Sequence, residues 1–376
     1  MTGATTRGMS PCAFGAICRN VAILGAIVLG SLCGYLFMSS TPSWSSLSWS
    51  LRAKVGIPVP LSVQKDAAQL VRAQGRLFFL FVLEDHLPHS KVWSAFFSAA
   101  PTGSYDAVAH CTRKDACEKS PEMQRMGIHI IDTVPTKPCV DVVSPIYQML
   151  RKAIAIAGPA DFPIQKFIVV GDSTLPLKSL TRMRDILLRT SSSDICPSPP
   201  DEWASSKISG TRYYVVKHHR WVILSRRHAD IFVENWQKMS KYSSFVKHGN
   251  ITVEPGDYKW NTPRMGLDGF ANTSDAFPRG NIAVPSRCPE EEVFTTLIFG
   301  LFENKMRSRW RSLFSAGKCR TYVNWKCERP PEEFSRVTPL LRQLALNTTE
   351  DGYLFAGRMA PGASFDELTP LIIGRR

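Results

Sequence analysis

The sequence of 376 residues predicts an α/β domain with a mainly parallel sheet, held behind an N-terminal transmembrane helix and a stem. Three observations lead to this fold class. Residues 21–38 are apolar and uncharged, and residues 39–75 are rich in Ser and Pro. From residue 76 onward, short apolar runs typical of buried strands alternate with helical patterns, and this order predicts a parallel sheet flanked by helices.

The first predicted element is the apolar stretch VAILGAIVLGSLCGYLFM at residues 21–38. A helix of this length spans roughly 27 Å, which is enough for a thin bilayer. Arg7 and Arg19 precede it, and no Lys or Arg follows before Arg52. The positive-inside rule therefore places the N-terminus in the cytoplasm and most of the chain in a lumen. A cleaved signal peptide is the rival interpretation, but the run is long for one and GYLFMSS is a poor cleavage site.

The chain thus divides into four predicted parts: a cytoplasmic tail at residues 1–20, an anchor at 21–38, a stem at 39–75 and a lumenal domain at 76–376. Three glycosylation sequons, at Asn250, Asn272 and Asn347, agree with a lumenal location. The cysteines beyond the anchor match no zinc-binding spacing and are disulfide candidates, with one left over and the connectivity open. They are Cys111, Cys117, Cys139, Cys196, Cys288, Cys319 and Cys327.

Within the lumenal domain, buried strands are predicted where unbroken apolar runs end at turn residues. Ligands bind beyond the carboxyl ends of such strands, and the turn Gly171-Asp172-Ser173-Thr174 follows one of them. Residues 243–287 are rich in Gly, Pro and Asn and are expected to be irregular. The strands are expected at 77–83 and from Ser104, Gly127 and Lys166, and the helices at 144–158 and from Leu180.

The chain is strongly basic, with 46 Lys and Arg against 32 Asp and Glu and a formal charge of +14. The basic residues are scattered rather than clustered with aromatic residues, and no nucleic-acid-binding motif is present, so nucleic acid is not an expected partner. A basic balance suits a phosphorylated or nucleotide ligand, or a position beside an anionic membrane. The sequence gives no indication of an oligomeric state.

Three carboxylates stand in a row in the stretch RCPEEEVFTTLIFG, residues 287–300. One interpretation is a helix start, with Pro289 in the first position, acids facing the helix dipole, and packed residues after them. The other interpretation is that one of the carboxylates is a catalytic base. The packed residues of the predicted helix are Val293, Phe294, Leu297 and Ile298.

Seven segments, in chain order, resemble one family. They are RLFFLFVLEDHLPHSKVWSAFF from residue 76, SYDAVAHC from 104, FIVVGDSTLPLKSL from 167, HHRWVILSRRHADIF from 218, CPEEEVFTTL from 288, RTYVNW from 320 and YLFAGRM from 353. The family is that of the core-2/I-branching β-1,6-N-acetylglucosaminyltransferases, with their xylosyl- and glucuronosyltransferase relatives. The resemblance implies a GT-A-like nucleotide-sugar-binding domain in a single-pass type II protein of the Golgi membrane.

The resemblance also implies an activity: inverting, metal-independent transfer of a sugar from a UDP-sugar to a hydroxyl of a glycan or glycoprotein acceptor. N-acetylglucosamine is the favoured sugar, and no cofactor is expected. The chain contains no Asp-x-Asp motif, the usual metal-binding signature of such folds. A xylosyl- or glucuronosyltransferase on the same scaffold is one alternative, and a non-catalytic lumenal glycan-binding protein is another. The family's small residues before a tryptophan are replaced here by His219-Arg220.

The resemblance assigns the base of the reaction to Glu291, with Glu290 as the preceding acid. A shift of one residue would assign it to Glu292. An inverting enzyme needs such a base to take the proton of the acceptor hydroxyl. The acids can therefore start a helix while one of them is the base.

Positive charge must stabilise the departing nucleoside diphosphate. The resemblance assigns this role to Arg358, with Arg320 as a second candidate. The alternatives are a solvated surface arginine and a charge at a strand edge, respectively. Arg336 and Lys326 are possible substitutes.

Four further residues are candidates for contacts with the substrate or nucleotide. Asp172 is either a turn residue or a ligand of the sugar nucleotide or acceptor. Lys178 is either a helix-start lysine or a site residue. Trp221 can stack on a sugar or pack in the core. His110 ends a strand near the family's nucleotide site, but a buried histidine with satisfied hydrogen bonds is the alternative. No metal ligands are assigned.

Overall fold

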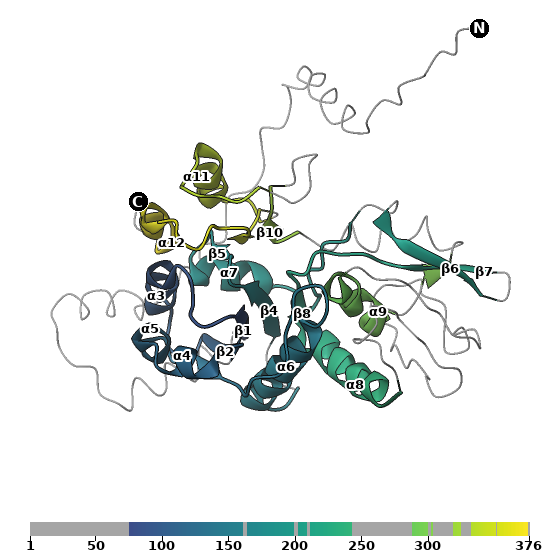
Figure 1. Ribbon diagram of the computed structural model, residues 1–376. Coiled ribbons are helices and arrows are strands. Elements are labelled where there is room, and N and C mark those ends of the chain that lie inside the picture. Colours follow the sequence, from purple (N-terminus) through teal and green to yellow (C-terminus); the bar gives the residue numbers. More distant parts are fainter. Residues whose placement is uncertain are drawn as a thin grey trace, which may run out of the picture.

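A computed structural model describes residues 75–160, 164–198, 202–208, 211–242, 288–299, 302–303, 319–324, 332–350 and 352–374 (Figure 1). The predicted anchor at 21–38, almost all of the predicted stem, and the region at 243–287 lie outside the described residues. Within the described ranges, no helix is both long and apolar enough to cross a membrane. The anchor therefore stays a prediction.

A mostly parallel five-stranded sheet forms the centre of the fold and confirms the predicted α/β class. The strand order is β3-β2-β1-β4-β8, in which the first four are parallel and β8 is antiparallel to β4. The parallel strands therefore end at one common edge. The bounds are β1 (Arg76–Leu83), β2 (Tyr105–Cys111), β3 (His129–Ile130), β4 (Gln165–Gly171) and β8 (Ile223–Ser225).

Strand β1 is apolar on both faces, because successive side chains of a strand point to opposite sides. Leu77, Phe79 and Phe81 belong to the core on one face of the sheet. Phe78 and Leu80 belong to the core on the other face. All five side chains are fully buried. Such a strand suits the interior of a sheet that is covered on both sides.

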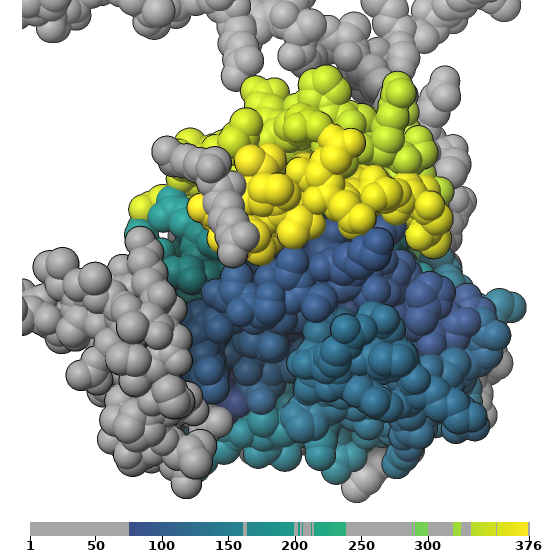
Figure 2. Space-filling model, turned by 90° about the vertical axis from the view of Figure 1, so that its left-hand side faces the viewer, coloured from purple at the N-terminus to yellow at the C-terminus, as the bar shows by residue number. Residues whose placement is uncertain are grey.

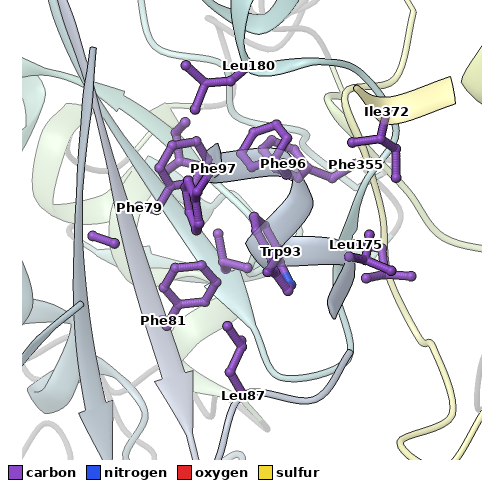
Figure 3. Packing of buried hydrophobic residues seen from close by; sticks show 14 of the residues in the cluster. Phe79, Phe81, Leu87, Trp93, Phe96, Phe97, Leu175, Leu180, Phe355 and Ile372 are labelled. Atoms are coloured by element: carbon purple, nitrogen blue, oxygen red, sulfur yellow. The ribbon is translucent and has the colours of Figure 1, made fainter. Parts of the chain in front are cut away.

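The first core is rich in aromatic rings, and Figure 3 shows how they converge. Phe79 makes edge-on contacts with Trp93, Phe96 and Phe97 at centroid distances of 6.2, 5.7 and 5.3 Å. The elements that build or border this face are α3 (Ser90–Ser98), α4 (Lys114–Glu118), α5 (Pro121–Arg125), α7 (Leu180–Leu187), the 3-10 turn η6 (Asp366–Leu368) and α12 (Thr369–Ile372).

The second core lies under α6 (Val143–Ala157), α8 (Arg226–Tyr242) and α9 (Val293–Phe299). Phe232 of α8 stacks on Phe294 of α9 at 4.8 Å. All four residues predicted to pack behind the acidic stretch are fully buried. A 3-10 turn, η4 (Pro289–Glu291), leads into α9, so the predicted helix start is confirmed.

The C-terminal residues pack against the first half of the domain, and Figure 2 shows this yellow segment directly against the blue part of the chain. A small sheet joins β5 (Leu175–Pro176), which follows β4, to strands from the end of the chain. These are β10 (Thr321–Tyr322) and β11 (Phe355–Ala356), near α11 (Pro339–Leu346). A third sheet contains β6 (Ala204–Ile208), β7 (Thr211–Val215) and β9 (Phe302–Glu303).

Three disulfides connect segments of the domain and confirm the predicted use of the cysteines. Cys111 pairs with Cys117, Cys139 with Cys288, and Cys196 with Cys319. Cys327, the remaining cysteine beyond the predicted anchor, lies outside the described residues. The Cys139–Cys288 bond has a sequence separation of 149 residues and ties the start of η4 to the loop before α6.

Replacing Phe79 tests the first core. Phe79→Ala should lower the free energy of unfolding by about 3–5 kcal/mol, because it leaves a cavity among closely packed rings. Leu346→Ala is the control, since Leu346 is 60% exposed and its truncation should change stability by less than about 0.5 kcal/mol. Urea unfolding followed by circular dichroism measures both. Equal losses in the two variants would contradict the placement of Phe79.

Candidate functional site

A cavity of about 330 Å³ lies at the carboxyl edge of the parallel strands. Its walls include Leu83 at the end of β1, Thr112 after β2 and Gly171 at the end of β4. Ligands of open α/β sheets bind at this edge. Among the residues predicted from the sequence to form the site, Asp172 and Trp221 line the cavity.

Asp172 lies in the turn that follows β4. The turn closes through a hydrogen bond of 3.2 Å from the backbone nitrogen of Thr174 to the oxygen of Gly171. One carboxylate oxygen of Asp172 accepts a hydrogen bond of 2.6 Å from the backbone nitrogen of Ser173. The side chain is exposed and lines the cavity, so both predicted roles, turn residue and ligand contact, fit its position.

Trp221 is fixed at the cavity by three neighbours. Its indole Nε1 donates a 3.0 Å hydrogen bond to Thr174 Oγ1. A Cβ added to Gly357 would stand 3.0 Å from ring atom Cζ2, so any larger residue there would push the ring away from its present position. The guanidinium of Arg220 lies 4.8 Å from the ring centroid in a cation–π contact. One face of the indole is therefore covered by Arg220.

Arg358 directly follows Gly357 in the chain, but it does not line the cavity. The backbone nitrogen of the following residue, Met359, donates a 2.9 Å hydrogen bond to Ser173 O, in the turn that contains Asp172. Arg358 has a φ of 65°, a conformation that costs free energy for a residue with a side chain. Its Nη2 lies 3.6 Å from a carboxylate oxygen of Glu333.

The three consecutive acids occupy different environments. Glu290 is buried, and its Oε1 accepts a 3.1 Å hydrogen bond from the backbone nitrogen of Cys139. Glu292 is also buried. Glu291 is half-buried, and its Oε2 lies 3.7 Å from Lys217 Nζ. None of the three acids lines the cavity. The two segments that contact η4, at residues 138–139 and 218–221, do contribute to the lining, through Pro138 and Arg220.

One group of possible metal ligands lies beside the acids. Within the described part of the chain, only Cys139, Cys288 and Glu290 bring three ligand atoms within 4.8 Å of one another. The two sulfurs are joined in a disulfide and are not thiolates. The thiolate is the form of cysteine that binds metals, so these residues do not fit a metal ion.

Lys178 and Arg320 are held by backbone oxygen atoms. Lys178 Nζ donates to the oxygens of Leu344 and Ala345 at the end of α11, where a cation suits the helix dipole. Burial lowers the pKa of Lys178 to about 8. Arg320 Nη1 donates to Glu350 O at 2.6 Å. Neither side chain belongs to the cavity lining.

His110 is also enclosed by the fold. It is fully buried, and its Nε2 lies 3.1 Å from both the backbone nitrogen and the backbone oxygen of Val134. Burial lowers the pKa of His110 below its usual value. The Nε2 atom thus has the backbone partner expected of a structural histidine, whereas the buried Nδ1 has no hydrogen-bond partner within the described part of the chain.

No family model matches the chain. Glycosyltransferase BC10 of Oryza sativa subsp. japonica is 24% identical to it over 210 residues, which are 53% of this chain and 50% of that protein. The chain thus spans about half the length of the curated relative that it matches. The similarity supports a relationship to glycosyltransferases. It does not distinguish the core-2/I-branching type from others.

The sequence prediction missed Arg220 as a site residue. Among the described residues that line the cavity, it is the only one with a positive charge. The replacement of small residues by His219-Arg220 was the available signal. A basic residue at one end of a loop is not by itself a site, and only the fold shows that this side chain reaches the cavity.

Two buried histidines, His218 beside the acidic stretch and His228 in α8, predict a specific dependence of stability on pH. His218 is fully buried, its Nδ1 donates a 2.8 Å hydrogen bond to His219 O, and its backbone nitrogen donates to Glu291 O at 2.6 Å. Burial lowers the pKa of His218 to about 4 and that of His228 to about 3.

Between pH 6.5 and about 4, the unfolded chain takes up protons at these histidines while the folded chain does not. The free energy of unfolding should therefore fall as the pH is lowered through this window, by up to about 1.4 kcal/mol per pH unit for each histidine. His218→Asn keeps a donor toward His219 O and should reduce the slope. Urea unfolding at pH 4.5 to 7.5 measures it, with exposed His129→Asn as control. An unchanged slope in His218→Asn would contradict a buried, neutral His218.

Proposed function

We propose that this protein is an inverting, metal-independent glycosyltransferase that moves a sugar from a UDP-sugar to a hydroxyl of a glycan or glycoprotein acceptor. N-acetylglucosamine is the favoured sugar, and the core-2/I-branching type is the favoured family. The observation that carries the proposal is the cavity at the carboxyl edge of β1, β2 and β4, which is lined by the carboxylates of Glu84 and Asp172, one guanidinium and one indole. The similarity to a glycosyltransferase supports the reaction class.

We place the proposed enzyme in the Golgi membrane, as a single-pass type II protein with residues 21–38 as its anchor and the described domain in the lumen. The support comes from the apolar run and the charges around it. The three disulfides agree with an oxidising compartment, where such bonds persist.

The proposed reaction needs one base and one cationic group. As the acceptor oxygen bonds to the anomeric carbon, the bond from that carbon to the phosphate oxygen breaks, and its electron pair leaves with UDP. Glu291 would take the acceptor proton. It is the least buried of the three acids, and its partner Lys217 also lies 2.7 Å from Glu202. Arg358 would stabilise the charge of the diphosphate. Neither residue lines the cavity itself: Glu291 accepts a backbone hydrogen bond from His218, and Arg358 follows Gly357, which packs against Trp221.

Ligand binding and turnover of the full chain, purified in detergent and in EDTA, test this assignment. Thermal stabilisation by a panel of UDP-sugars identifies the donor, since a ligand that binds only the folded state raises the melting temperature. Glu291→Gln should keep donor binding and lower turnover by about 10²–10⁴-fold, because it removes a general base. Arg358→Ala should weaken donor binding.

Two exposed residues supply the matched controls: Glu118→Gln and Arg125→Ala should leave both binding and turnover unchanged. If no UDP-sugar stabilises the protein, with or without Mn²⁺, the transferase proposal is wrong, and the glycan-binding alternative takes its place. Full turnover by Glu291→Gln would instead remove only the assignment of the base.

A further inference from the structure

The guanidinium of Arg220 is held in place at the mouth of the cavity. Its Cζ lies 4.8 Å from the centroid of the Trp221 ring, and that ring is in turn held by Thr174 and Gly357. Stacking on an aromatic face restricts an arginine side chain while its N–H groups stay directed outward in the guanidinium plane. The side chain is thus positioned before any ligand arrives.

The guanidinium also lies at the end of the central parallel strands. Its Nη2 is 3.8 Å from the point that a Cβ of Gly171 would occupy, at the last residue of β4. β4 neighbours β1, and the cavity reaches across the ends of both strands. Arg220 therefore presents its charge to the part of the fold where open α/β sheets bind nucleotides.

Arg220 differs from the two arginines expected to bind the diphosphate in having no carboxylate within ion-pair distance among the described residues. Arg320 is buried, with Nε 3.5 Å from Asp194 Oδ1 and Nη1 bonded to backbone oxygens. Arg358 is paired with Glu333. The carboxylates of Glu84 and Asp172 line the same cavity, but neither forms an ion pair with Arg220. A guanidinium that is positioned and not paired within the described residues is suited to an anionic ligand.

We propose that Arg220 binds the diphosphate of the donor nucleotide, through two parallel hydrogen bonds from its guanidinium to phosphate oxygens. This inference rests on the proposed function for the identity of the ligand. A guanidinium matches two oxygens of a phosphate group at once, which an ammonium cannot do. Arg220 thus supplies the positive charge that the buried Arg320 cannot direct into the cavity.

The place of the guanidinium favours phosphate over the carboxylate of an acidic sugar. The diphosphate is the part of a nucleotide sugar that joins nucleoside and sugar, so it must cross the middle of a site formed by several strand ends. Arg220 faces this middle from the β8 side, with Asp172 next to it on the turn after β4. The carboxylate of Asp172 can accept hydrogen bonds from hydroxyl groups of a sugar on its own side of the cavity.

Calorimetric titration of the full chain in detergent and EDTA tests the proposal with three probes: uridine, UDP and inorganic pyrophosphate. Arg220→Gln should weaken the binding of UDP and of pyrophosphate at least tenfold and leave the binding of uridine within twofold. Arg220→Lys keeps the charge but loses the paired hydrogen bonds and should lie between the two. Arg125→Gln, an exposed arginine on α5, should bind all three probes as the parent protein does.

The outcomes separate this proposal from the transferase proposal. If UDP binds the parent protein and Arg220→Gln equally well, Arg220 has no role in binding phosphate, while the transferase proposal stands. A second outcome is that pyrophosphate binds through Arg220, uridine does not bind, and UDP binds no more tightly than pyrophosphate. Arg220 would then bind oxyanions, but the proposed use of a nucleotide sugar would be wrong. If neither UDP nor pyrophosphate binds the parent protein, both proposals are wrong.

Circular dichroism of each variant shows whether it folds. If Arg220→Gln does not fold, Arg220→Lys provides the test, because it preserves the cation over Trp221. Tight binding of glucuronic acid without binding of pyrophosphate would also overturn the proposal, since the site would then recognise a carboxylate.

Discussion

Burial of β1 on both of its faces is the constraint on which the rest of the domain depends. The strand contributes to two separate apolar cores, and each core needs its own layer of helices. A strand of this kind is stable only when pairing strands satisfy its backbone and helices cover both faces. The parallel pairing of β1 with β2 and β4 meets the first need and aligns the carboxyl ends of all three strands.

The position of the cavity follows from this alignment. Helices cover the faces of the sheet, so the open space for a ligand lies beyond the strand ends, where loops supply polar side chains. Three chain segments meet there: the turn after β4, the residues before β8, and the residues after β11. Thr174, Trp221 and Gly357 join them through one hydrogen bond and one close ring contact. The contacts that shape the cavity are therefore also those that hold the C-terminal segment against the sheet.

The strands and the two long apolar faces were predictable because burial leaves a local trace in the sequence. The apolar run LFFLFVL at residues 77–83 is uninterrupted, and β1 contains all of it and begins one residue earlier, at Arg76. Roles of polar residues leave no such trace. Lys178, Arg320 and His110 fit a family motif equally well whether they face a ligand or a backbone oxygen far away in sequence. Lys178 donates hydrogen bonds to the backbone oxygens of residues 344 and 345, and a short sequence motif gives no information about such distant partners. Arg220 was missed for the same reason, since its environment comes from Trp221, Gly171 and Gly357 together.

The acidic stretch shows how a helix start and the proposed catalytic base can share one segment. Successive residues of a 3-10 turn such as η4 point about 120° apart, so three adjacent carboxylates cannot have one environment. Here Glu290 turns inward and binds the backbone of Cys139, which the disulfide to Cys288 holds nearby. Glu292 is also buried, and its backbone oxygen accepts hydrogen bonds from Thr295 and Thr296 at the start of α9. The two outer acids thus belong to the fold, and the residue between them keeps a side chain that is 29% exposed. An acceptor hydroxyl can be reached only by a carboxylate that is not enclosed by the protein, which is why the geometry favours Glu291 over its neighbours as the proposed base.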